Sequence, residues 1–470
     1  MEEGKRDFIE FLLQKDVLKF GEFNTKSGRP TPYFVNAGDL NTGDSIRKIG
    51  QEFARYIQSS GEKPNVIFGP AYKGISLSVA TSMELENLTS KSVGFAFDRK
   101  EEKEHGEATG LDLQKKVLVG AQINDGDKVI VVEDVFTTGQ TKYEAIQLLN
   151  KMAPNLSFPY MLIAVDRQEI DSFGNSALRE FSQSTKIPVI SVVSAADIHQ
   201  YLSEKGMTNE RERLENYLRV YGIEDVKKEL KISKLEEQTI IPIDRSVVVA
   251  LDVRTIGALE EVVIATADNP KIGGYKTGFL LGYRGLQYVV ETIRKHTQKP
   301  IIHDHQKAGT DIPMTGKDYA WICKESGVDA VILFPQSGPE TEYAWMMHAL
   351  DQELKVIVGG PMTHAGYKES EGGYLSDKGV ERMIRNPAKV GINNFVAPGT
   401  KLDDFKRVIE IVQEEGIENP HYFAPGFVAQ GGNITDAGRI AGKSWHAIVG
   451  TGIYAAENKR EAALRLTSQL

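Results

Sequence analysis

Short, uninterrupted apolar runs recur along this chain of 470 residues, and segments with helical spacing separate them. Such runs are typical of parallel strands that are buried on both faces. In the second half they recur regularly, and we expect eight strands, at residues 246–251, 274–276, 300–303, 329–334, 355–359, 394–397, 421–424 and 447–450. Eight strand–helix units in about 230 residues predict a (β/α)8 TIM barrel with its site at the C-terminal strand ends.

The first half alternates strands and helices less regularly, which favours an open, parallel α/β sheet. Residues 1–20 predict one amphipathic helix with Phe8, Leu12 and Leu13 toward one side. Residues 204–237 are rich in charge, with apolar positions at helical spacing, and predict a closing helix and a connector. The expected division is a first domain at 1–222, a helical charged connector at 223–240 and the barrel at 241–470.

Composition, net charge and cysteine content indicate the broad class of protein to which this chain belongs. A 41% hydrophobic and 26% charged chain is typical of a soluble globular protein, and its net charge of −9 argues against nucleic-acid or membrane-surface binding. The single cysteine, Cys323, excludes a disulfide framework; we expect a buried, inert thiol and a reducing compartment. No signal peptide or spanning segment is evident, so a cytoplasmic location is expected.

Candidate chemistry in the first half begins where the apolar run 129–132 ends. Glu133 and Asp134 follow it directly, and a loop of hydroxyls and glycine then opens a helix near Lys142. Backbone N–H groups in such a loop bind anions, and carboxylates accept hydrogen bonds from ribose hydroxyls or meet Mg²⁺ on a polyphosphate. The expected phosphate-binding residues of the loop are Thr137, Thr138, Gly139 and Thr141.

A second basic segment suits the same ligand. The stretch 129–141 resembles the 5-phosphoribosyl 1-diphosphate loop of phosphoribosyltransferases. The resemblance implies displacement of diphosphate from ribose C1 through an oxocarbenium-like species, so the departing charge must be neutralised. The expected diphosphate clamp is Arg99, Lys100, Lys103 and His105, with Lys103 or His105 assisting departure of the leaving group. Lys73 lies in a glycine-flanked turn after the run 66–68, where the backbone can approach a phosphate.

Four motifs in order resemble the orotate phosphoribosyltransferase family over about residues 5–222: KSGRPTPYF at 26–34, GPAYKGI at 69–75, RKEEKEHGE at 99–107 and DRQE at 166–169. The resemblance implies binding of 5-phosphoribosyl 1-diphosphate (PRPP) with Mg²⁺, for which no direct protein ligand is assigned. It implies orotate binding by Lys26, Phe34, Tyr72 and Arg167. It also implies a dimer, because the basic segment reaches across a dimer interface in that family. Glu133 stands where the family usually has aspartate.

In the second half, charge follows three expected strands. Asp252, Lys276 and Asp304 come at or after successive strand ends, and Lys307 and Asp311 lie just beyond. Buried Lys and Asp are rare unless they are paired, so an alternating array at a barrel mouth indicates a site more than a set of surface ion pairs.

This array, with ALD at 250–252, YKTG at 275–278, DIP at 311–313, APGFVAQGG at 424–432 and VGTGIY at 449–454, resembles orotidine 5′-monophosphate decarboxylase over about residues 240–467. The resemblance implies cofactor-free decarboxylation with Lys307 as proton donor, oriented by Asp304, Lys276 and Asp311, the last from the other subunit of a dimer. The implied nucleotide-binding residues are Asp252, Thr363, Gln430, Gly431, Gly450 and Thr451.

Two departures from the decarboxylase pattern stand out. The family spaces its segment D-x-K-x-x-D, whereas Asp304 and Asp311 enclose two more residues here, which implies a bulge or an altered loop. Thr451 stands where the family has the arginine that grips the phosphate, so another basic residue would have to replace it.

Several functions remain open. His303 and His305 flank Asp304 and would lie on one side of a strand, opposite Asp304, which keeps a metal-dependent aldol-type enzyme acting on a ketose phosphate as an alternative for the barrel. Two further alternatives are a barrel that is enzymatically inert and serves for dimerisation, and a regulator that binds PRPP without turnover. The leading hypothesis is a bifunctional enzyme, a homodimer or higher oligomer, that converts orotate and PRPP into orotidine 5′-monophosphate and then into uridine 5′-monophosphate.

Overall fold

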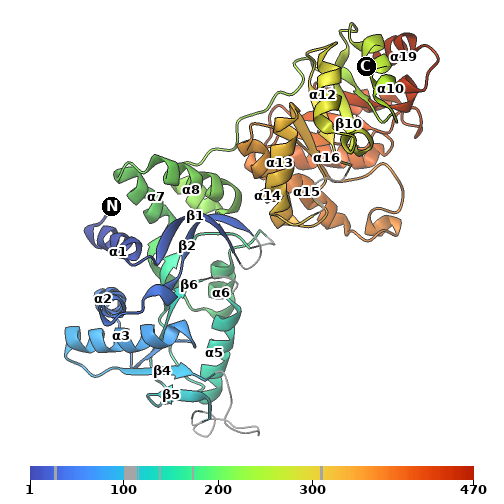
Figure 1. Ribbon diagram of the computed structural model, residues 1–470. Helices are drawn as coiled ribbons and strands as arrows, with labels where there is room; N and C mark the ends of the chain where they lie inside the picture. The colour runs from blue at the N-terminus through green and yellow to red at the C-terminus, as the bar shows by residue number, and fades with distance from the viewer. Residues whose placement is uncertain (26–28, 100–113, 115, 137–138, 172–173, 307–310) are drawn as a thin grey trace. The chain divides into compact units, whose positions relative to one another are not determined.

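The computed structural model describes residues 1–25, 29–99, 114, 116–136, 139–171, 174–306 and 311–470. These residues form two compact units, each considered by itself (Figure 1). Unit 1 contains Met1–Phe23 and Thr31–Ser233, and unit 2 contains Asn24–Pro30 and Lys234–Leu470. No helix in these ranges is long and apolar enough to cross a membrane.

Unit 1 is built on a six-stranded sheet in the order β5-β4-β3-β6-β7-β8, parallel except for the antiparallel β4–β5 pair. The strands are β3 (Val66–Phe68), β4 (Gly94–Asp98), β5 (Leu118–Gly120), β6 (Val129–Val135), β7 (Met161–Asp166) and β8 (Val189–Ser194). The helices are α1 (Glu3–Gln14), α2 (Gly43–Ser59), α3 (Lys73–Thr89), α5 (Gln140–Met152), α6 (Ala177–Thr185), α7 (Ala195–Glu204), α8 (Thr208–Tyr221) and α9 (Glu224–Glu229).

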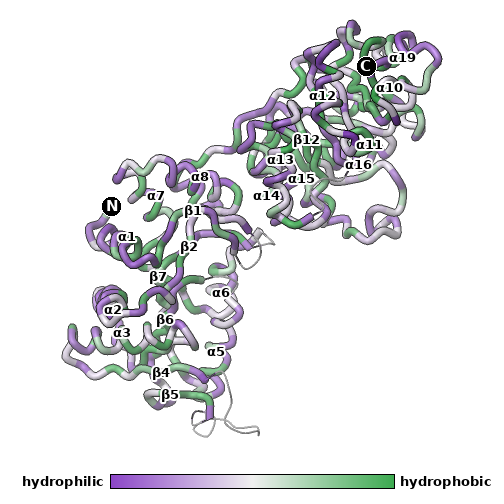
Figure 2. Tube along the Cα trace, viewed as in Figure 1, coloured by the Kyte–Doolittle hydropathy of each residue, from purple (hydrophilic) through white to green (hydrophobic). Residues whose placement is uncertain are grey.

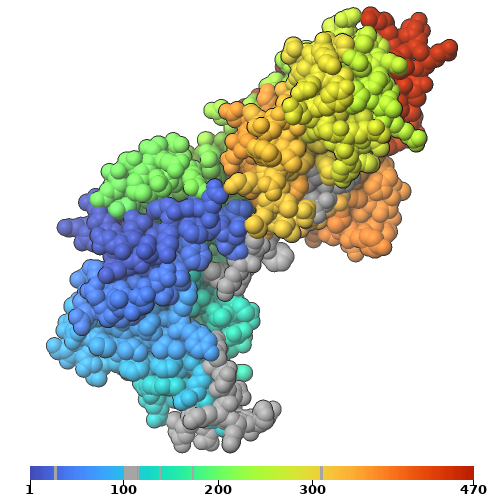
Figure 3. Space-filling model, viewed as in Figure 1, coloured from blue at the N-terminus to red at the C-terminus, as the bar shows by residue number. Residues whose placement is uncertain are grey.

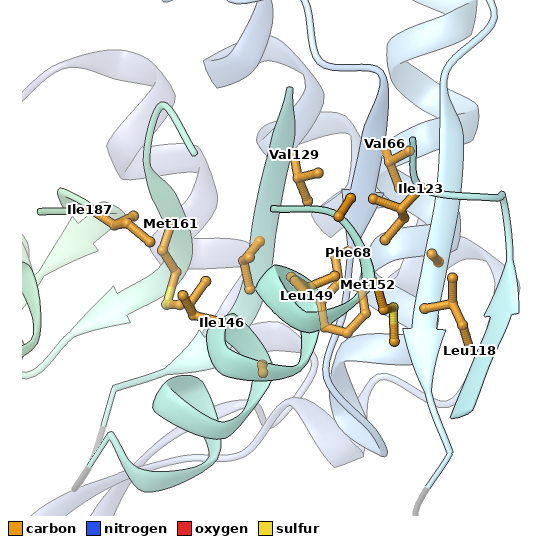
Figure 4. Packing of buried hydrophobic residues seen from close by; sticks show 14 of the residues in the cluster. Val66, Phe68, Leu118, Ile123, Val129, Ile146, Leu149, Met152, Met161 and Ile187 are labelled. Atoms are coloured by element: carbon orange, nitrogen blue, oxygen red, sulfur yellow. The ribbon is translucent and has the colours of Figure 1, made fainter. Parts of the chain in front are cut away.

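Both faces of this sheet are covered, which explains the uninterrupted apolar runs. Val129 and Val131 of β6 pack with Ile146 and Leu149 of α5 on one face (Figure 4). The alternate residues of β6 are equally buried, toward the helices α2 and α3. Figure 2 shows the hydrophobic strands β6 and β7, with many hydrophilic residues in the helices around them. The expected open α/β sheet is confirmed.

The prediction of one helix over residues 1–20 is wrong at its C-terminal end. Helix α1 stops at Gln14, and Leu18 begins β1 (Leu18–Asn24), which pairs with β2 (Pro30–Val35). Asp16 has a φ of 57°, a left-handed conformation that ends the helix, and the buried Val17 and Leu18 then enter the strand. A short apolar run did not distinguish these two structures.

Unit 2 is a closed barrel of eight parallel strands, and all eight expected strands are present. They are β9 (Arg245–Ala250), β10 (Ile272–Gly278), β11 (Ile301–Asp304), β12 (Ala330–Leu333), β13 (Lys355–Gly359), β14 (Asn394–Val396), β15 (His421–Pro425) and β16 (Trp445–Val449). Its helices are α10 (Ile256–Thr266), α11 (Phe279–Gly282), α12 (Leu286–Arg294), α13 (Thr315–Glu325), α14 (Pro339–Asp351), α15 (Asp377–Val390), α16 (Leu402–Glu414), α17 (Ile434–Ile440), α18 (Thr451–Tyr454) and α19 (Lys459–Thr467).

The chain that leads into the barrel packs against it. After α9 it has no regular structure until β9, but the Gln238 side chain accepts a hydrogen bond from Val356 N–H (3.0 Å). Ile240 and Ile241 belong to the apolar cluster inside the barrel. The boundaries at 222 and 240 remain a proposal. Cys323 lies in α13 and is buried, as expected. Burial raises the pKa of its thiol to about 12.

Helices α14 and α15 enclose a buried carboxyl group. Glu342 Oε2 accepts a hydrogen bond from Asn386 Nδ2 (2.8 Å), whereas Oε1 has no hydrogen-bond partner among the described residues. Burial raises the pKa of Glu342 to about 8, and Asn386 and Arg382 oppose this only in part. Glu342 therefore keeps its proton in the folded protein at neutral pH.

Glu342→Gln should stabilise the barrel at high pH only. Because folding raises the pKa of Glu342 from 4.5, its contribution to stability is fully present below that value and is lost as the pH rises toward 8. We expect a Tm several degrees above that of the parent protein at pH 8.5 and almost no change at pH 4.5. Glu353→Gln, at an exposed position, is the control; equal shifts at both pH values would contradict the assignment.

Candidate active sites

The first site lies where β3 and β6 end. Lys73 begins α3, and its Nζ lies 2.9 Å from Asp134 Oδ2 near the end of β6. The turn between β3 and α3 is tightly folded, because a Cβ on Gly69 would lie 1.8 Å from the Gly74 carbonyl oxygen. Ala71 N–H donates to Asp98 Oδ1 (2.6 Å) and ties this turn to β4. A half-exposed cation and a carboxylate thus meet at a turn that admits no side chain at its glycines.

A buried ion pair lies beside them. Lys142 Nζ is 3.1 Å from Glu133 Oε2, and both side chains are less than a tenth exposed. Burial raises the pKa of Glu133, which the Lys142 charge opposes. Lys142 was not among the residues predicted for this site from the sequence. The sequence feature that could have identified Lys142 is its place in the first turn of a helix. The helix dipole disfavours a cation there unless a carboxylate is near.

Gly139 precedes α5 with a φ of 79°, in the left-handed region that favours glycine. Thr141, in the first turn of α5, is exposed, as is Arg99 after β4. The other expected ligands of the phosphates lie outside the described residues. They are Lys100, Lys103, His105, Thr137 and Thr138, and Lys26 of the orotate set joins them.

Arg167 directly follows β7 and contacts polar and aromatic side chains. Its Nε donates to Glu169 Oε1 (2.7 Å), Nη2 donates to Thr31 Oγ1 (3.0 Å), and the guanidinium stacks 4.5 Å from the Tyr33 ring. These contacts fix the guanidinium plane and leave Nη1 without a hydrogen bond to a described residue. Such a preorganised donor can bind a carboxylate or a ring oxygen.

The two expected aromatic ligands of orotate lie nearer the surface. Phe34 is 37% exposed and stacks on Phe23 at 5.6 Å, and Tyr72 is 74% exposed. Tyr33, which precedes Phe34 in the chain, is fully buried. Of these three rings, Phe34 and Tyr72 are the exposed ones.

The second site lies at the C-terminal ends of β9, β10 and β11. Lys276 Nζ lies 3.3 Å from Asp304 Oδ2 and 3.5 Å from both carboxylate oxygens of Asp252. Burial alone would lower the pKa of Lys276, but Asp304 and Asp252 outweigh it and hold that pKa above its ordinary value. The array predicted from three strand ends is therefore assembled as one acid–lysine–acid cluster.

The remaining barrel residues lie around the same mouth. Gly426 has a φ of 107°, and a Cβ there would lie 3.1 Å from Thr363 Cγ2 and 3.3 Å from Gln430 Oε1, so these two side chains converge on one glycine. Thr451 is exposed at the start of α18, with Oγ1 3.1 Å from Tyr454 Oη, and Gly450 precedes it. Gly431, next to Gln430, has a φ of 83°. Asp311 is exposed, and Lys307 lies outside the described residues.

The two histidines that flank Asp304 lie near each other. The rings of His303 and His305 are 6.2 Å apart, and His303 Nδ1 is 3.0 Å from Thr277 Oγ1. Burial, and then His305, lower the pKa of His303 to about 4, so it is neutral at physiological pH. Within the described ranges, no three His, Cys, Asp or Glu side chains are placed to share a metal ion.

Both halves of the chain are similar to known proteins. Residues 38–163 match the family described as phosphoribosyl transferase domain, and residues 245–466 match the orotidine 5′-phosphate decarboxylase / HUMPS family. The chain is 36% identical over 231 residues to orotate phosphoribosyltransferase of Clostridium acetobutylicum, and 42% identical over 224 residues to that of Alteromonas mediterranea. Each alignment covers 47% of this chain and 100% of the relative.

Solved structures match the two halves separately. Orotate phosphoribosyltransferase of Francisella tularensis is 36% identical and covers 46% of this chain and 100% of its own, with a TM-score of 0.40. Orotidine 5′-monophosphate decarboxylase of Methanocaldococcus jannaschii, solved with the inhibitor BMP, is 26% identical. That alignment covers 48% of this chain and 98% of the other, with a TM-score of 0.43.

Proposed function

We propose that this chain, which belongs to the orotate phosphoribosyltransferase family in its N-terminal half and to the orotidine 5′-phosphate decarboxylase / HUMPS family in its C-terminal half, makes uridine 5′-monophosphate in two steps. The first site transfers phosphoribosyl from PRPP to orotate, and the barrel decarboxylates the product. The observation that carries the second step is the Lys276 ammonium held between Asp252 and Asp304 at the barrel mouth.

In the transferase step, Glu133 and Asp134 accept hydrogen bonds from the ribose hydroxyls, while Lys73 and the glycine-rich turn before it face the diphosphate. Lys73 pairs with Asp134 in this structure, so it exchanges that contact for phosphate when PRPP binds. The half-exposed Lys73 can do so at small cost. Arg167 offers Nη1 to orotate. Oxygen-rich surroundings suit Mg²⁺, which would bind with PRPP and neutralise the departing diphosphate.

In the decarboxylation step, negative charge develops at C6 of the pyrimidine, so a nearby cation stabilises the transition state and a proton must follow. We assign the proton donor to Lys307, and Lys276 and Asp304 orient it. A fixed Asp304 carboxylate beside the substrate carboxylate also favours loss of CO2. Thr363 and Gln430 converge on Gly426 and suit the base and the phosphate.

An assay of the full chain with orotate, PRPP and Mg²⁺ tests both steps, with orotidine 5′-monophosphate and uridine 5′-monophosphate followed separately. Accumulation of orotidine 5′-monophosphate would overturn the second step. Decarboxylation of added orotidine 5′-monophosphate should persist in a chelator, because no step at the barrel uses a metal. Loss of that activity in chelator would favour the metal-dependent aldol-type alternative.

A dimer through the barrel fits the surface near Asp311. The segments between β10 and β12, yellow in Figure 3, expose several large apolar side chains. They are Phe279, Leu280, Tyr283, Tyr288, Ile312, Met314, Trp321 and Ile322. Large apolar side chains exposed together suit an interaction site, and a second copy would bring its Asp311 with it.

Hybrid dimers test that arrangement. Lys307→Ala and Asp311→Asn chains should each lack decarboxylase activity, but co-expression should restore about a quarter of the sites. The reason is that half of the dimers are hybrids, and each hybrid has one site with both residues intact. Co-expression of two copies of the Lys307→Ala chain is the control. No recovery would place both residues in one subunit's site.

A further inference from the structure

The barrel site contains a segment, Asp304 to Asp311, that is two residues longer than the decarboxylase pattern. We propose that Gln306 and Thr341 are positioning residues that hold the two ends of this segment, Gln306 at Asp304 and Thr341 at Asp311. The proposal rests on the proposed decarboxylase function. Both ends lie within the residues that the structure describes.

Gln306 joins the end of β11 to the beginning of α11. Its backbone is left-handed, with a φ of 50°, and its N–H donates to Asp304 Oδ1 (2.8 Å). Its side-chain Oε1 accepts a hydrogen bond from the N–H of Phe279, the first residue of α11 (3.3 Å). Asp304 thus uses Oδ1 for this turn and presents Oδ2 to Lys276, 3.3 Å away.

Gly278 makes room for this arrangement. A Cβ on Gly278 would lie 2.5 Å from Asp252 Oδ1 and 3.2 Å from Gln306 Oε1. The Gln306 amide and the Asp252 carboxylate therefore pack over the same point of β10, two residues beyond Lys276. Gln306 thus lies close to both acids that flank the lysine, to Asp304 through its backbone N–H and to Asp252 across Gly278.

Thr341 holds the other end of the segment from α14. Its buried hydroxyl donates to the carbonyl oxygen of Asp311 (2.8 Å). One turn later on the same helix, Trp345 Nε1 donates to the carbonyl oxygen of Ile312 (3.0 Å). Two consecutive carbonyls are thus bound to a single helix, while the Ile312 side chain remains 57% exposed.

The hydrogen bonds of Gln306 and Thr341 matter for turnover because the effect of Asp304 and Asp311 on the reaction depends on where their carboxylates lie. Asp311 is exposed and has no ion pair to a described residue, so only its backbone contacts and a hydrogen bond from Ile312 N–H to Oδ1 (2.8 Å) hold it. A displacement of about 1 Å at a reacting group lowers turnover about a hundredfold. Loss of one anchor leaves the other in place, so a partial displacement is expected.

The test compares Thr341→Val, which keeps the shape but removes the donor, with Thr341→Ser, which keeps it. Thr341→Val should lower kcat for decarboxylation at least about tenfold with little change in KM. Thr341→Ser should retain most of the activity. Thr292→Val is the matched control, because Thr292 is a buried helical threonine whose hydroxyl bonds only to its own helix, at Tyr288. Gln306→Gly, which favours the left-handed backbone but removes the side chain, should act like Thr341→Val.

Amide hydrogen exchange supplies a readout that does not depend on activity. Protection of Ile312 and its neighbours should fall in Thr341→Val and stay unchanged in Thr292→Val. Equal exchange and equal kcat in these two variants would overturn the inference. A parent chain without decarboxylase activity would overturn the proposed function, and the exchange data would then decide by themselves whether Thr341 holds the segment.

Discussion

Lys276→Met should abolish decarboxylation while orotidine 5′-monophosphate formation continues. The substitution removes an ammonium group that contacts both Asp252 and Asp304 in a largely buried site. Loss of such a preorganised charge lowers turnover by about a thousandfold. Breaking these two ion pairs also destabilises the barrel by roughly 3 kcal/mol. Both effects are measured on one preparation, by product analysis and by thermal unfolding.

A double variant separates activity from folding. Asp252→Asn with Lys276→Met removes one charge of each sign, so the Tm should recover most of its loss while decarboxylation stays absent. Lys271→Met, at an exposed position in the same βα unit, is the control and should change neither property. Recovery of turnover in the double variant would show that Lys276 acts only on stability.

Lys142→Met should destabilise unit 1 and weaken PRPP binding. Glu133 would remain buried without its partner, and breaking a buried pair costs about 3–5 kcal/mol. Folding raises the pKa of Glu133 already, and loss of Lys142 raises it further. A carboxyl with a raised pKa stabilises the folded state below the unfolded pKa and loses that contribution as the pH rises. The Tm difference from the parent should therefore be small near pH 4.5 and large at pH 8.

Glu133→Gln in the Lys142→Met background restores a neutral pair. It should recover the Tm at pH 8 but leave the KM for PRPP high, because an amide is a weaker acceptor for ribose hydroxyls. Lys151→Met, on the exposed surface of the same helix, is the matched control. A destabilisation that does not depend on pH would contradict the role of Glu133.

Much of the fold was predictable because burial on both faces of a parallel sheet leaves a continuous apolar signal. All eight barrel strands and the strand before Glu133 were found in this way. The prediction for residues 1–20 was wrong because the spacing of the apolar residues there suits a helix or a strand. These residues are Phe8, Leu12, Val17 and Leu18. The decision came from the left-handed turn at Asp16 and from burial of Val17 and Leu18.

The residues of the candidate sites were also predictable from the sequence only in part. Asp252, Lys276 and Asp304 stand at the ends of three successive strands, and parallel strands in a barrel bring those ends together, so their cluster followed from sequence order. Lys142 was not assigned because its partner, Glu133, lies on another element. Gln306 and Thr341 gave no signal, because neither residue type nor spacing marks a neutral side chain whose hydrogen bond crosses to another helix or loop.

The sequence by itself determined the two fold classes, the order of the strands and the charged residues at their ends, because local patterning and strand order act along the chain. Only the tertiary structure decided which oxygen faces which donor. It showed that Lys276 is shared by two acids, that Lys142 compensates Glu133, and that residues of α11 and α14 form hydrogen bonds to Gln306 and Asp311. Those contacts join residues on different elements, and their distances depend on how helices pack against strands.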